Sequence, residues 1–92
     1  MTEELKISYE GTDLLLIFGQ EPRASLCING VERESVSSDK PAITLKLSST
    51  VQTDYEWHEY VEAIVVYSAN TIRASILASN KELITTTRDR AK

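Results

Sequence analysis

Residues 53–68 read TDYEWHEYVEAIVVYS, and the conformation of this stretch decides the fold of the chain. In a helix, a cap at Thr53 would lead into an apolar face that contains Trp57 and the valines, with glutamates gathered on the opposite face. In a strand, alternate side chains would form an apolar face that only Glu59 interrupts. The cap and the acidic stripe favour the helix, whereas the aromatic and β-branched residues favour the strand. We therefore predict a helix near residues 54–67 and retain a strand as its alternative.

The sequence around Asn29-Gly30 predicts an antiparallel hairpin. This dipeptide favours a type I′ turn because both of its residues then take positive φ. Residues 23–28 before it alternate between apolar and polar side chains, and residues 31–36 after it are mainly polar. The polar second strand is expected at an edge of the sheet or with one face in solvent.

Further strands are predicted where apolar residues alternate with polar ones or form a short run. Residues 14–18 (LLLIF) are apolar on both faces, which indicates a strand in the centre of a sheet. Four other segments alternate or are rich in threonine: residues 5–9, 43–48, 72–78 and 83–87. Short turns between strands imply antiparallel neighbours. The predicted fold class is mainly β, with α+β as the second choice, and the architecture is a small antiparallel sandwich or partly open barrel of about seven strands.

A chain of 92 residues has room for one hydrophobic core, so residues 1–92 are expected to form a single domain. Residues 1–4 and 88–92 are expected to be frayed tails. Apolar runs are too short to span a bilayer, and the early glutamates do not fit a signal peptide. The lone cysteine, Cys27, has no partner for an intramolecular disulfide, which is typical of a reducing compartment. We therefore predict a cytoplasmic protein without membrane contact.

The net charge of −4 argues against direct binding of nucleic acid. Such binding needs concentrated positive charge that displaces counterions from the phosphates. The basic residues are dispersed, apart from Arg88, Arg90 and Lys92, which Asp89 interrupts. An acidic chain could instead inhibit a nucleic-acid-binding protein by imitating nucleic acid, and this function is retained as an alternative.

The residues that carry catalysis and metal binding are scarce. His58 is the only histidine and Cys27 the only cysteine, whereas zinc sites need three or four protein ligands. Glycine-rich phosphate loops and the motifs of serine hydrolases and zinc proteases do not occur. A small hydrolase or ligand-binding barrel could use Glu56, Glu59 and Glu62, although such a stripe usually faces solvent. We predict no catalytic residue, no metal and no cofactor, hence a protein that is not an enzyme, and retain the hydrolase or barrel as a second alternative.

A protein-contact site is predicted around the only tryptophan of the chain. Residues 54–60 interleave aromatic and acidic side chains, and tyrosine and tryptophan are enriched at the centres of protein interfaces. A domain of this size cannot bury all of these rings together with the neighbouring valines. We therefore predict a contact patch for a partner with a basic surface, composed of Asp54, Tyr55, Glu56, His58 and Glu59.

These observations favour a small cytoplasmic binding or regulatory domain that acts through protein contacts. A homodimer through an edge strand, formed by residues 31–36 or residues 83–87, would fit a small domain that completes its core by association. No motif is specific enough to indicate a family, and the sequence does not identify the partner or the biological process.

Overall fold

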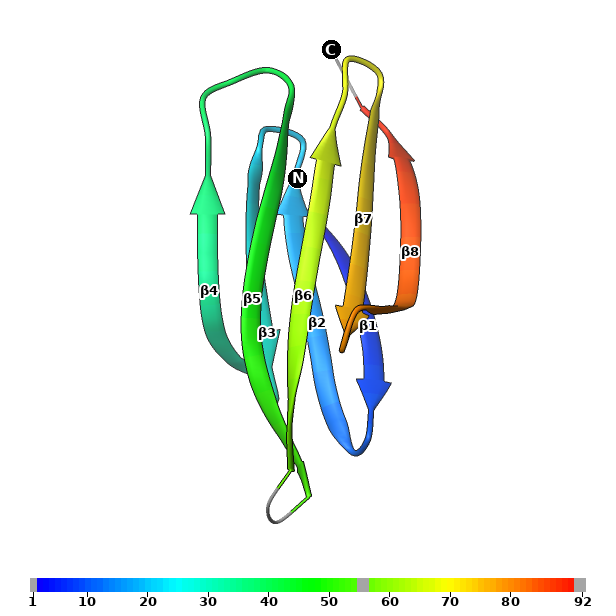
Figure 1. The fold of residues 1–92 in the computed structure, drawn as a ribbon. Coiled ribbons are helices and arrows are strands. Elements are labelled where there is room, and N and C mark those ends of the chain that lie inside the picture. Colours follow the sequence, from blue (N-terminus) through cyan, green and yellow to red (C-terminus); the bar gives the residue numbers. More distant parts are fainter. Residues whose placement is uncertain (1, 55–56, 91–92) are drawn as a thin grey trace.

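The computed structural model describes residues 2–54 and 57–90. This part of the chain contains eight β-strands and no helix. It therefore contains no helix that could cross a membrane. The strands form two antiparallel four-stranded sheets that lie face to face (Figure 1). Sheet 1 contains β1 (Thr2–Tyr9), β2 (Thr12–Gly19), β3 (Arg23–Ile28) and β4 (Val31–Ser37). Sheet 2 contains β5 (Ile43–Asp54), β6 (Trp57–Tyr67), β7 (Thr71–Ala78) and β8 (Lys81–Asp89). The prediction of a mainly β, antiparallel fold is confirmed, with eight strands instead of about seven.

The stretch that decides the fold forms strand β6, so the prediction of a helix near residues 54–67 is wrong. Val61, Ala63 and Val65 alternate along β6 and are fully buried between the sheets. The strand pairs with β5 on one side and with β7 on the other. Caps and acidic stripes act locally, whereas pairing on both sides comes from distant segments, and here the distant segments outweigh the local signals.

Each sheet is a meander in which every strand pairs with its neighbour in sequence. The angles φ of 51° at Asn29 and 81° at Gly30 agree with the predicted type I′ turn. Two further two-residue turns also have positive φ at both residues, Glu10-Gly11 and Ser79-Asn80. The chain crosses between the sheets after β4, so an edge strand of sheet 1 leads directly to an edge strand of sheet 2.

The core consists of the inward-facing apolar residues of both sheets. In sheet 1, β2 contributes Leu14, Leu16 and Phe18, each at most 1% exposed. Leu15 and Ile17 alternate with them on the outer side of the same strand and are half-buried. The LLLIF run therefore belongs to a central strand, as predicted, but only one of its faces contributes to the core.

Tyr67, the last residue of β6, joins the two sheets through its hydroxyl group. The residue is 2% exposed, and its hydroxyl oxygen lies 2.8 Å from the carbonyl oxygen of Gly19 and 3.0 Å from that of Arg23. The same oxygen accepts a hydrogen bond of 3.4 Å from the backbone N–H of Arg23. Burial raises the pKa of Tyr67, so the phenol remains a neutral donor at physiological pH.

Arg90 closes the same end of the sandwich. Its guanidinium carbon lies 5.1 Å from the centre of the Tyr67 ring. The guanidinium donates hydrogen bonds to the carbonyl oxygens of Gln20 at 3.2 Å, of Ser68 at 2.8 Å and of Pro41. These carbonyls belong to three different loops, so one side chain from the segment expected to be a tail fastens three connections between strands.

Removal of the Tyr67 hydroxyl group should weaken the fold. We expect Tyr67→Phe to lower the free energy of unfolding by about 1–3 kcal/mol, because the carbonyl groups of Gly19 and Arg23 lose their donor. Unfolding in urea measures this change. Tyr60→Phe is the matched control, since Tyr60 is 47% exposed and its substitution should change the free energy by no more than about 0.5 kcal/mol. Equal effects of the two substitutions would contradict the role of Tyr67.

Candidate functional site

Strands β5 and β6 extend beyond the rest of sheet 2 as a two-stranded ribbon. β7 pairs with β6 only from Val61 onward, so residues 57–60 of β6 pair with β5 alone. Figure 1 shows this ribbon projecting past the other hairpins, at the end of the sandwich opposite to the C-terminus. The molecule is accordingly elongated, with principal dimensions of 46 × 20 × 19 Å. Asp54, His58 and Glu59 of the predicted contact patch belong to this ribbon.

Of the predicted patch residues, His58 and Glu59 lie on opposite faces of β6. His58 is exposed on the outer face of sheet 2, whereas Glu59 is half-buried and points inward, because successive residues of a strand alternate. Asp54 lies in β5 and its backbone is the partner of Trp57 across the ribbon. Tyr55 and Glu56 lie outside the described residues.

Glu59 interacts with Tyr9, the last residue of β1 in the opposite sheet. A hydrogen bond between the Tyr9 hydroxyl group and the Glu59 carboxylate raises the pKa of Tyr9 to about 12, and partial desolvation and the negative charges of Glu59 and Glu10 act in the same direction. Atom Oε2 of Glu59 is buried and has no hydrogen-bond partner among the described residues. Glu59 therefore links the ribbon to sheet 1 and points away from the outer face of β6.

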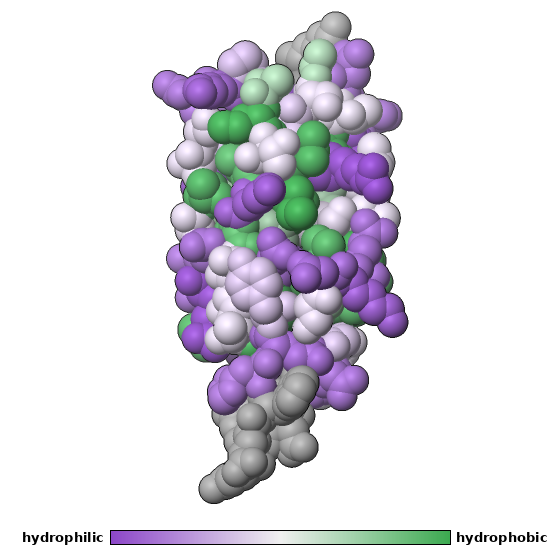
Figure 2. All heavy atoms as spheres, in the orientation of Figure 1, coloured by the Kyte–Doolittle hydropathy of each residue, from purple (hydrophilic) through white to green (hydrophobic). Residues whose placement is uncertain are grey.

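The outer face of β6 carries a row of side chains that we call the outer row: His58, Tyr60, Glu62, Ile64 and Val66. Tyr60 is 47% exposed, while Ile64 and Val66 are half-buried. Figure 2 views the molecule from the side of sheet 2 and shows apolar side chains gathered over this sheet between charged ones. Tyr60 is absent from the predicted patch, although strand alternation places it beside His58. The signal was present in the sequence, but it required the strand to be preferred over the helix.

Charged side chains of the neighbouring strands give the two ends of the outer row different character. Lys46 of β5 and Arg73 of β7 flank the end that is remote from the ribbon. Towards the ribbon, Leu77 of β7 lies between Glu62 of β6 and Glu82 of β8. The outer row therefore runs from a basic, apolar end to an acidic end that carries the exposed aromatic ring.

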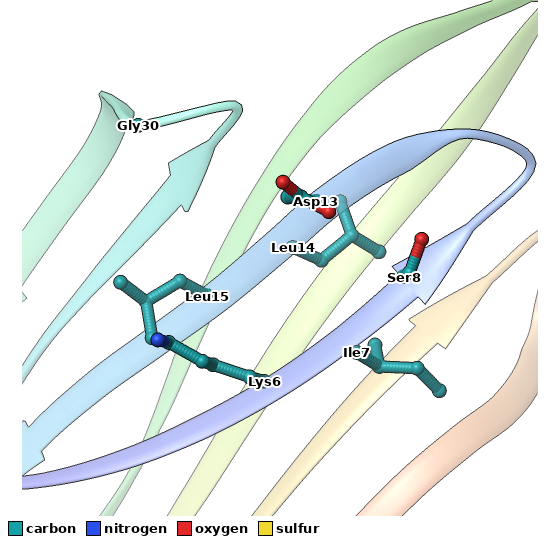
Figure 3. Close-up of a pocket in the computed structure, with 7 residues that line it drawn as sticks. All are labelled: Lys6, Ile7, Ser8, Asp13, Leu14, Leu15 and Gly30. Carbon is teal, nitrogen blue, oxygen red and sulfur yellow. The ribbon is translucent and has the colours of Figure 1, made fainter.

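The outer face of sheet 1 contains a separate, open hollow of about 550 Å³ (Figure 3). Lys6 of β1 extends over the sheet near Leu15, its neighbour across the β1–β2 pair. Asp13 and Ser8 also line the hollow. A cluster of three or more metal-ligating side chains is not found here or elsewhere within residues 2–54 and 57–90. The hollow is therefore a weaker candidate than the outer row.

Comparison of the chain with models of protein families, with curated protein sequences and with solved structures finds no match in any of the three. The candidate site therefore rests on the geometry of the outer row and the ribbon.

The Tyr9–Glu59 interaction predicts a loss of stability at alkaline pH. The pKa of Tyr9 is about 12 in the folded chain against an ordinary value of 10.0. The contribution of the Tyr9–Glu59 interaction to stability is therefore complete below about pH 10 and is lost as the pH rises from about 10 to about 12. Tyr9→Phe lacks this contribution, so its free energy of unfolding should fall less over the same range. Denaturant titrations at several pH values measure the difference, and equal slopes for the two proteins would contradict the interaction.

A second substitution identifies the partner of Tyr9. Glu59→Gln retains an acceptor for the hydroxyl group but removes the negative charge, so the pKa of Tyr9 should move back towards 10.0. The absorbance of the phenolate, compared between proteins with and without Tyr9→Phe, reports this pKa directly.

Proposed function

We propose that this chain is a small binding domain that acts through protein contacts, and that the outer row is its contact surface. The observation that carries this proposal is the exposure of Tyr60. Tyr60 is 47% exposed and lies at the base of the ribbon, next to the turn between β7 and β8. Tyrosine and tryptophan are enriched among the residues that contribute most of the binding energy at protein interfaces.

The backbone at Tyr60 is held in place before any partner arrives. Tyr60 pairs with Thr50 of β5, and its carbonyl oxygen accepts a hydrogen bond of 2.8 Å from the backbone N–H of Ser79. A tyrosine side chain also has few rotatable bonds, so little conformational entropy is lost when it is covered. A prearranged ring of this kind favours binding because the cost of ordering has already been met by folding.

The charges near Tyr60 favour a partner with a basic surface. Glu62 and Glu82 lie on the ribbon side of the outer row, and Asp54 belongs to the same ribbon. The chain as a whole carries a net charge of −4. Opposite charges accelerate encounter and fix orientation, while the apolar side chains of Ile64 and Leu77 supply surface that can be dehydrated. A non-enzymatic, regulatory role in the cytoplasm is part of this proposal.

Substitution of Tyr60 should remove partner binding without unfolding the domain. We expect Tyr60→Ala to weaken binding by about 2 kcal/mol, roughly 30-fold in Kd, as for a residue at the centre of an interface. Proteins of the native host that are retained by the immobilised domain are compared between variants by quantitative mass spectrometry. A partner with a basic surface should also be released at high salt, because screening weakens the attraction.

Val31→Ala serves as the matched control for this measurement. Val31 is 59% exposed but lies on β4 in the other sheet, so its substitution should leave the retained proteins unchanged. Retention that is equal for wild type and Tyr60→Ala, or that is lost only with Val31→Ala, would place the contact surface elsewhere.

A further inference from the structure

The four edge strands of the sandwich differ in how well their unpaired backbone groups are protected. These strands are β1 and β4 in sheet 1 and β5 and β8 in sheet 2. An unprotected edge is a template on which another strand can pair. Natural proteins protect such edges by covering them, by interrupting them with a bulge or by placing charges along them.

One edge is covered by a contact between the sheets, and a second is charged. At β5, the backbone N–H of Ser48 donates a hydrogen bond of 2.8 Å to Oε1 of Glu34, which belongs to β4. The edge of β1 carries three charged residues, Glu3, Glu4 and Lys6. Glu3 also forms an ion pair of 3.2 Å with Arg88, so this contact lies at the start of β1 and at the end of β8 alike. Glu34 therefore covers part of the β5 edge, and charges line the β1 edge.

The edge of β4 is interrupted and charged. Its register against β3 shifts between Leu26 and Cys27, in the middle of the hairpin. Three consecutive charged residues occupy the same part of β4: Glu32, Arg33 and Glu34. A regular additional strand would not find a continuous ladder here.

The edge of β8 is uncharged from Leu83 to Thr87, between charged residues at its two ends. Its one shift in register lies near its start, between Ile76 and Leu77 of β7, and from Ile84 onward β8 pairs with β7 without interruption. The sequence from Ile84 is Ile-Thr-Thr-Thr, four β-branched residues without a charge. The hydroxyl groups of Ser75 and Thr85, 2.9 Å apart, hold this segment to β7. Figure 1 shows β8 on the outside of its sheet, farther out than β1.

The direction of the backbone groups along β8 is fixed by a neighbouring hydrogen bond. The N–H of Arg90 donates to the carbonyl oxygen of Asn70 at 2.8 Å, so the even-numbered residues at this end of β8 bond towards the body of sheet 2. Because these directions alternate along an antiparallel strand, Thr85 and Thr87 direct their N–H and C=O groups outward. These outward groups are the unpaired ladder.

We propose that two copies of this chain pair antiparallel through β8 and join their second sheets into one continuous sheet of eight strands. With the two-fold axis at Thr86, Thr85 pairs with the partner's Thr87 and Thr87 with the partner's Thr85, which uses all outward groups of both residues. Ile84 then lies opposite the partner's Arg88, whose aliphatic stem can cover it. No charges of like sign meet directly in this register, and opposed threonines stabilise antiparallel pairs.

A second copy of the chain is the occupant that these residues fit. An antiparallel pair of one strand with its own copy is isologous. It suits β8 because residues 83–87 carry no charge, so no like charges meet near the axis, and because it uses the outward groups of Thr85 and Thr87. The paired segment is short, so the contact belongs with the small, transient interfaces, and the dimer should dissociate on dilution.

Removal of one outward N–H group tests the edge. Thr87→Pro deletes a donor that β7 does not use, so the monomer should fold while the Kd of the dimer rises by about tenfold or more. Sedimentation velocity at concentrations up to about 500 µM measures the dimer fraction. Glu32→Pro is the matched control, since Glu32 follows the first residue of β4 and directs its N–H outward from the other sheet; it should leave the dimer intact.

A double substitution provides the same test if proline prevents folding. Thr85→Lys with Thr87→Lys keeps every N–H group but sets lysines opposite lysines in the proposed register, so the dimer should again be lost. A wild-type chain that remains monomeric over the whole range, or a dimer that survives both β8 variants, would overturn the proposal. Loss of the dimer with Glu32→Pro and not with the β8 variants would assign the contact to β4 instead.

Disulfide formation tests the register. In a chain with Cys27→Ser, Thr86→Cys should crosslink on oxidation, because residues on the axis in a non-hydrogen-bonded pair have Cα atoms about 4.5 Å apart. Thr87→Cys should not crosslink, since two residues of offset separate its Cα from the partner's Thr87 by about 8 Å. Efficient crosslinking at position 87 and not at position 86 would overturn the proposed register.

Discussion

The hydroxyl group of Tyr67 lies where the two sheets meet. The loops at this end of the sandwich keep the hydroxyl group buried and hydrogen-bonded. Its acceptors, the carbonyl groups of Gly19 and Arg23, belong to sheet 1, whereas its backbone belongs to sheet 2. A buried phenol without a partner would be unfavourable by about 1–3 kcal/mol, so the loop after β2 has little freedom to move. Arg90 covers the ring and fastens the neighbouring loops. The spacing of the sheets is thereby set at this end, and the interaction between Tyr9 and Glu59 joins them near the other.

Local signals in the sequence were sufficient for the hairpins and the central strand, and insufficient for β6. The turn at Asn29-Gly30 depends only on the backbone conformation of these two residues. The apolar composition of LLLIF is enough to indicate a central strand of a sheet. The helix and strand patterns of β6 are nearly equal locally, and only pairing with β5 and β7 separates them. The bond between Tyr67 and Gly19 spans 48 positions, and Arg90 lies in a segment with the composition of a tail. The alternation of apolar and polar residues along the sequence does not reveal hydrogen bonds between such distant residues. The candidate site shows the same division, because alternation locates Tyr60 only after the strand has been chosen.

The two sheets contribute differently to stability and to the proposed contacts. Sheet 1 provides loops, carbonyl acceptors and Glu34, all of which fix sheet 2 in place. Sheet 2 carries both the outer row on its face and the unprotected edge at β8. A two-fold axis through β8, perpendicular to the joined sheet, would leave both outer rows on the same side of it and pointing in opposite directions. Such an assembly could engage two sites on one partner, and the second contact would then form at a high effective concentration.

The position of the two chain ends determines how the fold would respond to a pulling force. Thr2 begins β1 and Arg90 follows β8, and both ends lie opposite to the ribbon (Figure 1). Tension between them would first load the ion pair of Glu3 with Arg88 and the loop contacts of Arg90. It would then act on the end pairs of β1 with β2 and of β8 with β7, and it would separate residue pairs one after another because it acts across these ladders. In a tethered arrangement the domain would open from the end that holds Tyr67 and Arg90, while the ribbon at the other end carried no load.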